Sequence, residues 1–428
     1  MTKRLKYFFL LAFSVIVVSC KVSDRVSAPR NLERIYDPSS SSFHPQIKIY
    51  NNSDSTSLII ERILTKELLY NLANPENKLK ARIRVIYNLY DLNNKQALVD
   101  SSTTTFSFKK SDKLLYQSIE IDVNAVVGNN YILEVITTDL NRNSNQYSFF
   151  KIDRTGKHSI QDFLLYNRAS DELLLTSYIS VDKQIKVDHY KKELDSLHVF
   201  YFKNEFSVPP PPFMEDSVSD QFTKYDSVWI CSADSVHYAD LQNEGVYYFS
   251  LTPDLNYNKE GFTLFNFGSG YPVVRTPDDL AQSVIYLGGI DSVSVADTTG
   301  KLTKLAVDNF WLKRTNNIDK SRELLKFYYN RVMFANNYFT SYKEGWQTDR
   351  GMVYIIYGLP DYLFKAGDEE RWIYNPNGIG PGTVFTFKYK KHPLTLNHFV
   401  LDREKLKSTG WDQTLKMWNT GEIFYYQN

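Results

Sequence analysis

Cysteine is scarce in this chain: Cys20 and Cys231 are the only two among 428 residues. A chain with so few cysteines has no disulfide framework of the kind that supports small secreted domains. Its length is sufficient for a sizeable hydrophobic core and is typical of two to three domains. The fold must therefore rest on core packing.

An excess of either charge is also lacking. Lys and Arg together number 50 and Asp and Glu 49, which gives a formal net charge of +1. A near-neutral chain has no electrostatic reason to seek nucleic acid. We expect no nucleic-acid partner.

Metal-binding and catalytic patterns are missing as well. The seven histidines show no HExxH or other metal-ligand spacing. The Gly268-Ser269-Gly270 stretch lacks the outer frame of a nucleophile elbow. The acids Asp368, Glu369 and Glu370 offer two readings, a pair for general acid–base chemistry or a charged hairpin edge, and we favour the edge. We expect no metal, no cofactor and no catalytic residue.

The N-terminus has the features of a secretory signal. Basic residues at positions 3, 4 and 6 precede an apolar run from Tyr7 to Val18, which is too short to span a bilayer, and Ser19 and Cys20 follow. The residues before Cys20 resemble a lipobox, which predicts a signal peptide over 1–19 and acyl chains, palmitate among them, on Cys20. The alternative is an ordinary signal peptide with a chance cysteine.

By resemblance to bacterial lipoprotein sorting, Lys21 after the cysteine favours the outer membrane, and the weak acidic character that follows favours its periplasmic face. Residues 20–44 are polar, with four serines from Ser39 to Ser42, and predict a lipidated tether.

Short apolar or alternating segments follow, spaced at roughly ten residues with turn-forming residues between them. They predict two tandem immunoglobulin-like β-sandwiches, over 45–156 and 157–274. The first contains strands over 46–50, 57–64, 81–91, 103–109, 117–123, 130–138 and 147–152, and the second over 172–179, 196–202, 227–231, 245–251 and 261–267. The 27 Phe and 31 Tyr residues suit such half-buried sheets.

At Thr276 the pattern changes, and residues 275–428 predict an α+β domain. Thr276, Pro277 and two acids mark a helix start. A long helix over 320–342, capped by Asp319, is expected to precede a three-stranded meander over 352–357, 370–374 and 383–389. A last helix over 411–418 is expected to end at Gly421. The fold class is thus mainly β with a C-terminal α+β domain.

The most distinctive segment, residues 345–361, reads GWQTDRGMVYIIYGLPD. Together with Asn309-Phe310-Trp311 and Trp372-Ile373-Tyr374 it resembles the signature of the GWxTD-domain proteins, which are bacterial lipoproteins. The resemblance implies an α+β domain behind β-sandwiches. It implies no activity, because it brings no catalytic residues with it.

The signature indicates a structural turn more than a ligand or catalytic site. Gly345 is expected to take a positive φ at the helix end, and Trp346 to be buried between helix and sheet. Asp349 is expected to accept N–H groups from Gly351 or Met352. The residues of this predicted turn are Gly345, Trp346, Thr348, Asp349, Arg350, Gly351, Gly358, Pro360 and Asp361. Adjacent in the chain, Asp349 and Arg350 should point apart.

A second recurring element is Asp followed by Ser or Thr and then by an apolar residue or Thr. It resembles a periplasmic bacterial O-glycosylation sequon and predicts sugar on exposed hydroxyls. Its acceptor residues are Ser55, Ser196, Ser217, Ser227, Ser235, Ser292 and Thr298. The alternative is that the pattern recurs without any glycosylation, because Asp, Ser and Thr are common in the turns that precede strands.

The leading functional hypothesis is a non-enzymatic interaction or scaffold subunit, held at the outer membrane by its lipid. An accessory role in an envelope protein assembly or secretion complex, with an outer-membrane β-barrel complex as partner, extends it. The alternatives are a glycan-binding surface lipoprotein, suggested by the many aromatic residues, and an envelope hydrolase that uses the region of Asp349 and Glu369.

Overall fold

The structure is a computed structural model, and it describes residues 31–37 and 43–422 apart from short internal gaps. Those gaps are 74–77, 95–96, 112, 156–159, 180–183, 192–193, 204–205, 216–221, 223, 237, 258–260, 290–303, 375–381 and 407–409. The predicted signal peptide and Cys20 lie outside the described residues. Within the described part of the chain, no helix has both the length and the apolar character needed to cross a bilayer.

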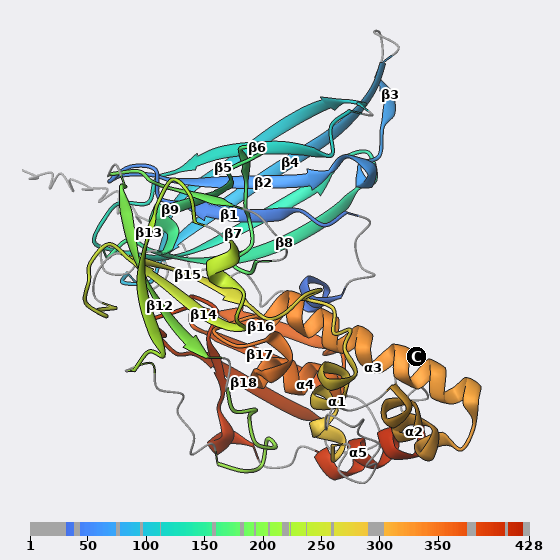
Figure 1. The fold of residues 1–428 in the computed structure, drawn as a ribbon. Helices are drawn as coiled ribbons and strands as arrows, with labels where there is room; N and C mark the ends of the chain where they lie inside the picture. The colour runs from blue at the N-terminus through green and yellow to red at the C-terminus, as the bar shows by residue number, and fades with distance from the viewer. Residues whose placement is uncertain are drawn as a thin grey trace, which may run out of the picture. The chain divides into compact units, whose positions relative to one another are not determined.

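Residues 46–153 form two antiparallel sheets around one core (Figure 1). One sheet has the order β1-β2-β6, and the other has the order β3-β4-β7-β8 with β5 also paired to β4. Strand side chains alternate between faces, so Ile83, Val85 and Leu89 on β4 all point into the core. The strands are β1 Gln46–Tyr50, β2 Ser57–Leu64, β3 Asn71–Ala73, β4 Lys78–Asp91, β5 Ala97–Lys109, β6 Tyr116–Val123, β7 Asn130–Asp139 and β8 Ser144–Asp153.

A second pair of sheets occupies residues 163–266, with orders β10-β9-β11 and β13-β12-β14-β15. Side chains of both sheets share one core. The other face of the four-stranded sheet is also covered, by a cluster that includes Tyr342 and Leu394 from the C-terminal region. The strands are β9 Phe163–Asn167, β10 Glu172–Leu173, β11 Ile185–His189, β12 Ser196–Lys203, β13 Ser227–Ser232, β14 Gly245–Ser250 and β15 Gly261–Asn266.

The C-terminal region combines five helices with a four-stranded antiparallel sheet, β16-β17-β18-β19, in the part that the structure describes (Figure 1). The apolar face of α3 packs on the sheet: the rings of Phe339 and Trp372 lie 5.5 Å apart. The helices are α1 Pro277–Ser283, α2 Lys304–Thr315, α3 Ile318–Phe339, α4 Asp349–Tyr357 and α5 Trp411–Thr420. The strands are β16 Tyr362–Ala366, β17 Glu369–Tyr374, β18 Thr383–Tyr389 and β19 Phe399–Leu401.

The predicted fold class, mainly β with a C-terminal α+β part, is confirmed. The helix start at Thr276 is also confirmed, because the Thr276 hydroxyl accepts from the Asp279 N–H and the Asp279 carboxylate accepts from the Thr276 N–H. At α3 the cap is Asn317, whose side chain accepts from two backbone N–H groups, and Asp319 lies in the first turn instead. As predicted, α5 ends at Gly421, which has a φ of 70°.

The strand predicted over 352–357 is wrong. These residues belong to α4, which begins after Thr348 and ends at Gly358. The segment is apolar on every side because α3, the sheet and α5 surround it, and such a run does not distinguish a buried helix from a buried strand. The missing strand of the meander is supplied by β16, and β19 extends the sheet.

The predicted tether also differs from the structure over 31–37. Residues 33–36 form the 3-10 helix η1, and Leu32 and Tyr36 are buried in the same core as α3 and α4. The backbone N–H of Leu32 donates to the carbonyl of Leu363 at the start of the C-terminal sheet, 2.8 Å away. Two apolar side chains in a polar stretch are enough to dock this segment.

Candidate functional site

Two glycines let the signature segment approach α3 and the neighbouring turn closely. A Cβ at Gly345 would lie 2.0 Å from the carbonyl oxygen of Ala335 on α3, and one at Gly351 would lie 1.9 Å from the carbonyl oxygen of Gly345. Neither distance leaves room for a side chain. The expected positive φ at Gly345 is not found. Glycine is required there because the backbone of α3 is too close for a side chain, and not because the residue needs a positive φ.

Trp346 is buried, as predicted, with 3% of its surface exposed, and its ring lies 6.3 Å from that of Tyr286. Its backbone N–H donates to Asn336 Oδ1 at 3.0 Å, and its indole N–H donates to Glu344 Oε2 at 3.0 Å. The Tyr286 hydroxyl donates to its carbonyl at 2.8 Å. Every polar group of Trp346 is thus used to fix the turn between α3 and α4.

Thr348 starts α4. Its hydroxyl oxygen accepts from the Gly351 N–H at 3.0 Å and its hydroxyl hydrogen is donated to the Gly345 carbonyl at 2.7 Å. Asp349 was expected to accept the Gly351 N–H, so that detail of the prediction is wrong. Threonine before a helix caps it by the same geometry as aspartate.

Asp349 instead reaches across to β19 and the turn after it. Its carboxylate accepts from the Leu401 N–H at 2.9 Å and from Arg403 Nη2 at 2.7 Å. It also lies in the first turn of α4, where the helix dipole favours a negative charge. The aspartate therefore joins the start of α4 to the far strand of the sheet.

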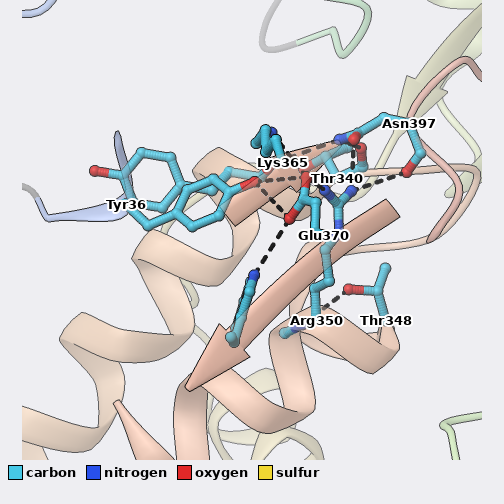
Figure 2. Close-up of polar contacts among 10 residues, drawn as sticks. Tyr36, Thr340, Thr348, Arg350, Lys365, Glu370 and Asn397 are labelled. Carbon is cyan, nitrogen blue, oxygen red and sulfur yellow. Dashed lines mark hydrogen bonds and ion pairs between the residues drawn. The ribbon is translucent and has the colours of Figure 1, made fainter. Parts of the chain in front are cut away.

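Arg350 has partners other than Asp349, as predicted, although both lie in α4 and not in an extended strand, and it is 2% exposed. Its Nη1 donates to Glu370 Oε1 at 3.0 Å and its Nη2 donates to Asn397 Oδ1 at 2.5 Å. The guanidinium also lies over the ring of Phe399, 4.2 Å from its centroid. Figure 2 shows this side chain extended between Glu370 and Asn397.

Glu370 on β17 is the centre of the cluster, and it is 1% exposed. Besides Arg350, it contacts Lys365 Nζ at 2.7 Å and accepts from the Tyr36 hydroxyl at 3.0 Å and from the Trp372 indole N–H at 3.3 Å. Figure 2 draws these contacts converging on one carboxylate. The expectation of a charged hairpin edge is wrong for this residue.

The electrostatics of the cluster favour full ionisation. Burial alone would raise the pKa of Glu370, but Lys365 and Arg350 more than offset it and hold that pKa at about 2. For Lys365, burial acts to lower the pKa, but the adjacent carboxylate raises it overall. Burial raises the pKa of the Tyr36 hydroxyl, which therefore stays a donor. A carboxylate with a pKa near 2 is a weak base at neutral pH.

The N-terminal segment completes this cluster. Besides its bond to Glu370, Tyr36 accepts at its backbone carbonyl from the Tyr354 hydroxyl at 3.0 Å. Its ring packs edge-on to Phe339, with centroids 4.8 Å apart. The Asn31 side chain donates to the Asp361 carbonyl at 2.9 Å, which ties the segment to the end of the signature.

The C-terminal end of α4 is closed by buried donors. Arg331 on α3 donates to the carbonyl of Ile355 at 2.7 Å, and the Trp418 indole N–H donates to that of Ile356 at 3.0 Å. Gly358 then takes a φ of 85° and accepts at its carbonyl from a tyrosine hydroxyl of β17. Pro360, after it, is buried. Both ends of α4 are thus fixed by side chains from elsewhere in the fold.

The segment 206–212, which contains four successive prolines, is attached to the signature region. Arg403 Nη2, besides its contact with Asp349, donates to the Pro210 carbonyl at 3.1 Å. Lys343 Nζ donates to the Ser207 carbonyl at 2.8 Å. Because proline has no N–H group, its carbonyls are the backbone groups left to accept such bonds.

Burial shifts the pKa values of three titratable groups outside the cluster toward the uncharged form. Burial lowers the pKa of His392 to about 3 and that of His398 to about 4, with nearby Lys343 and Lys390 adding to the effect. In the first sandwich, burial raises the pKa of Glu61 to about 7. Glu61 Oε1 accepts from the Thr137 hydroxyl at 2.7 Å.

The other predicted site residues are not gathered at this cluster. Ser55, Ser196 and Ser227 are exposed and Ser235 is half-buried, on the two β-sandwich regions. Ser217, Ser292 and Thr298 lie outside the described residues, as does Cys20. Among the residues that the structure describes, no three His, Cys, Asp or Glu side chains are placed to share a metal ion.

Sequence reasoning missed the partners of the signature: Tyr36, Lys365, Glu370, Asn397 and Arg403. A signal existed for Glu370, because it alternates with Trp372 and Tyr374 along β17, and the aromatic residues mark that face as buried. Asn397 and Arg403 carry no comparable signal, since irregular segments bring them to the site.

The fold and the site together define a β-rich protein whose C-terminal α+β region is built around a buried ionic turn. The family model for the GWxTD domain matches residues 245–420. The chain therefore contains a GWxTD domain, as the resemblance implied. The match begins about thirty residues before the boundary expected at 275, so it includes β14 and β15.

No curated protein matches the chain. Among solved structures it is similar over short stretches to a Bacteroides uniformis beta-glucuronidase, with 10% identity, a TM-score of 0.18, and coverage of 29% of this chain and 14% of that one. Bacteroides uniformis beta-glucuronidase 2 gives 9% identity, a TM-score of 0.19, and coverage of 38% and 16%. Such low scores carry no argument about function.

Proposed function

We propose that this protein is a lipoprotein anchored to the outer membrane through Cys20, and that it acts there as a non-enzymatic interaction or scaffold subunit of an envelope protein assembly or secretion complex. The observation that carries the proposal is the buried pairing of the signature charges. Arg350 is committed to Glu370 and Asn397, and Asp349 to Arg403 and the Leu401 N–H.

These pairs join four parts of the chain: the segment 31–37, the proline segment, α4 and the C-terminal sheet. A side chain that holds such a junction is not available to turn over a substrate without breaking the fold. Removing one partner of a buried ion pair is expected to cost about 3–5 kcal/mol. The signature thus supports a framework that holds outer surfaces in position, which is what a scaffold subunit requires.

Affinity purification tests the interaction role. The full chain with a C-terminal tag is purified from membranes of its own host in mild detergent, beside a matched variant with Cys20→Ser. We expect defined partner proteins to co-purify with the wild type and to be lost when the variant leaves the membrane fraction. Recovery of the wild type alone, under conditions that preserve other envelope complexes, contradicts the proposal.

Lipid attachment has its own measurement. Metabolic labelling with a palmitate analogue should mark the wild type and leave Cys20→Ser unlabelled. Protease treatment of intact cells then reports the facing, and the periplasmic location proposed here requires protection until the outer membrane is permeabilised. Label on the serine variant, or cleavage on intact cells, refutes the respective part.

We propose that the Asp-Ser/Thr sequons are O-glycosylation sites, because they resemble a periplasmic bacterial O-glycosylation sequon. Ser55, Ser196 and Ser227 are exposed, which a glycosyltransferase requires. Intact-mass measurement on protein from the native host decides, because a mass equal to chain plus lipid removes the idea.

A further inference from the structure

The strand β13 leaves one backbone edge of its sheet open. It stands at the end of the order β13-β12-β14-β15, and among the described residues it forms a ladder with β12 alone, apart from one isolated bridge from its last residue, Ser232, to Ser235 (Figure 1). Two of its apolar side chains are exposed on one face, Val228 at 44% and Ile230 at 63%. Unpaired N–H and C=O groups beside exposed aliphatic side chains form a template for another strand.

Two longer outer strands of the first sandwich, β5 and β6, carry charged residues, and β13 does not. The strand β5 carries Asp100 and Lys109, and β6 carries Glu120 and Asp122. In contrast, β13 reads SVWICS, with no charged residue, no proline and no β-bulge. Native proteins use charges, prolines and bulges to block edge-to-edge pairing. Their absence on β13 favours an edge that is covered when the protein is assembled.

We propose that β13 pairs in antiparallel fashion with β13 of a second copy of this chain, about a two-fold axis at Trp229. When two sheets join edge to edge through antiparallel strands, the two-fold axis is perpendicular to the sheets. The same face of both sheets then lies on the same side, and one residue of the strand lies opposite its own copy in the partner strand. Centring on Trp229 places Val228 of one copy opposite Ile230 of the other, twice. Both exposed aliphatic side chains then gain an apolar cross-strand neighbour.

The charges that flank β13 fit the same register. Lys224 and Asp234 are both exposed, before and after the strand. In the antiparallel pair centred on Trp229 the Lys224 end of one copy lies beside the Asp234 end of the other, at both ends of the interface. Opposite charges therefore meet at both ends, while Asp234 keeps its 3.0 Å ion pair with Arg168 of its own copy and Asp226 lies opposite the uncharged Ser232. This self-complementarity identifies a second copy, and not an unrelated peptide, as the occupant that fits.

The interface is short, since six residues per copy pair, so the dimer is expected to be weak and concentration-dependent. The inference is independent of the proposed scaffold role, because it concerns self-association alone.

Sedimentation tests it on the full chain with Cys20→Ser in mild detergent. The apparent mass should rise from monomer toward dimer with concentration. Ile230→Lys should weaken association about tenfold or more, because it removes two apolar cross-strand pairs. The matched control Leu98→Lys changes an exposed aliphatic residue on another outer strand, β5, and should associate as the parent does. A monomer at the highest soluble concentration, or equal association of the two lysine variants, overturns the proposal.

A cross-link tests the register without relying on the fold of the lysine variant. Residue 227 of one copy should lie opposite 231 of the other, so Ser227→Cys should form an intermolecular disulfide with the native Cys231 under mild oxidation. Within one copy, residues four apart on a strand are about 13 Å from each other, too far to bridge. The control Ser196→Cys, exposed on β12, should stay monomeric. Cross-linking of the control as fast as of Ser227→Cys, or of neither, contradicts the pairing.

Discussion

The carboxylate of Glu370 gives a quantitative test of the buried cluster. Glu370→Gln keeps the size of the side chain and one acceptor but removes the charge, and it leaves Arg350 and Lys365 facing a neutral group at 3.0 and 2.7 Å. Breaking a buried ion pair costs about 3–5 kcal/mol. The pKa gives a similar figure: a fall from 4.5 to about 2 corresponds to about 3 kcal/mol of folding free energy at neutral pH.

The sign of the pH dependence follows from that depressed pKa. In the unfolded chain Glu370 takes up a proton near pH 4.5, while in the folded chain it does so near pH 2. Its stabilising contribution is therefore present above pH 4.5 and is lost as the pH falls from 4.5 toward 2. The difference in stability between the wild type and Glu370→Gln should be full at pH 7 and should shrink over that interval.

Thermal unfolding followed by tryptophan fluorescence is the assay. Five of the six tryptophans, at 311, 346, 372, 411 and 418, lie in the C-terminal region and report on it. A loss of about 3–5 kcal/mol predicts a melting temperature lower by about 6–20 °C. The neighbouring Glu369→Gln is the control, with an expected change within about 0.5 kcal/mol. If both variants melt alike, or if the difference is the same at pH 3 and pH 7, the ionic-cluster account is refuted.

Three further perturbations test the described packing and burial. Gly351→Ala forces a methyl group against the Gly345 carbonyl and should cost roughly 2–4 kcal/mol in urea unfolding; an unchanged midpoint contradicts the close approach. His392 and His398 stay neutral in the folded chain, so the unfolded chain takes up their protons first and the stability of the fold should decrease below about pH 6.5. Replacing both by Phe should make the urea midpoint less dependent on pH between about pH 6.5 and about pH 4. An unchanged pH dependence of the midpoint counts against this. Because the pKa of Glu61 is raised, its contribution to the folding free energy is full below pH 4.5 and is lost as the pH rises through about 7. Glu61→Gln should therefore be more stable than the wild type by about 3 kcal/mol at pH 8 and equally stable at pH 4. Equal stability of the two proteins at both pH values argues against a protonated Glu61.

The β-rich part of the fold was largely predictable because one physical signal dominates it. Alternation of apolar and polar residues identified the strand 57–64 to the residue, and most other strands within a few positions. The short strand β9 was missed, because nearly every residue of Phe163–Asn167 is apolar and buried, so no alternation exists to read. Turn chemistry also worked where it is local, as at Thr276.

The C-terminal region was less predictable because burial on every side removes periodicity. The run 352–357 is apolar and partly β-branched, and nothing in its own sequence distinguishes the helix from a strand. What decides is the close approach that Gly345 and Gly351 permit, together with the cap at Thr348. The role of Glu370 depends on residues far away in sequence, and local patterns carry little information about such partners.

The docking of residues 31–37 sets an order of events for synthesis. Tyr36 leaves the ribosome more than 300 residues before Glu370, so the earliest part of the folded chain must wait for the latest part. Closing contacts over such a separation is entropically costly and slow. A fragment that begins at the predicted domain boundary, 275, would lack Leu32 and Tyr36 and expose the core that they cover. The two ends of the chain therefore have to be studied together, and a C-terminal fragment is best designed with residues 31–37 rejoined to it.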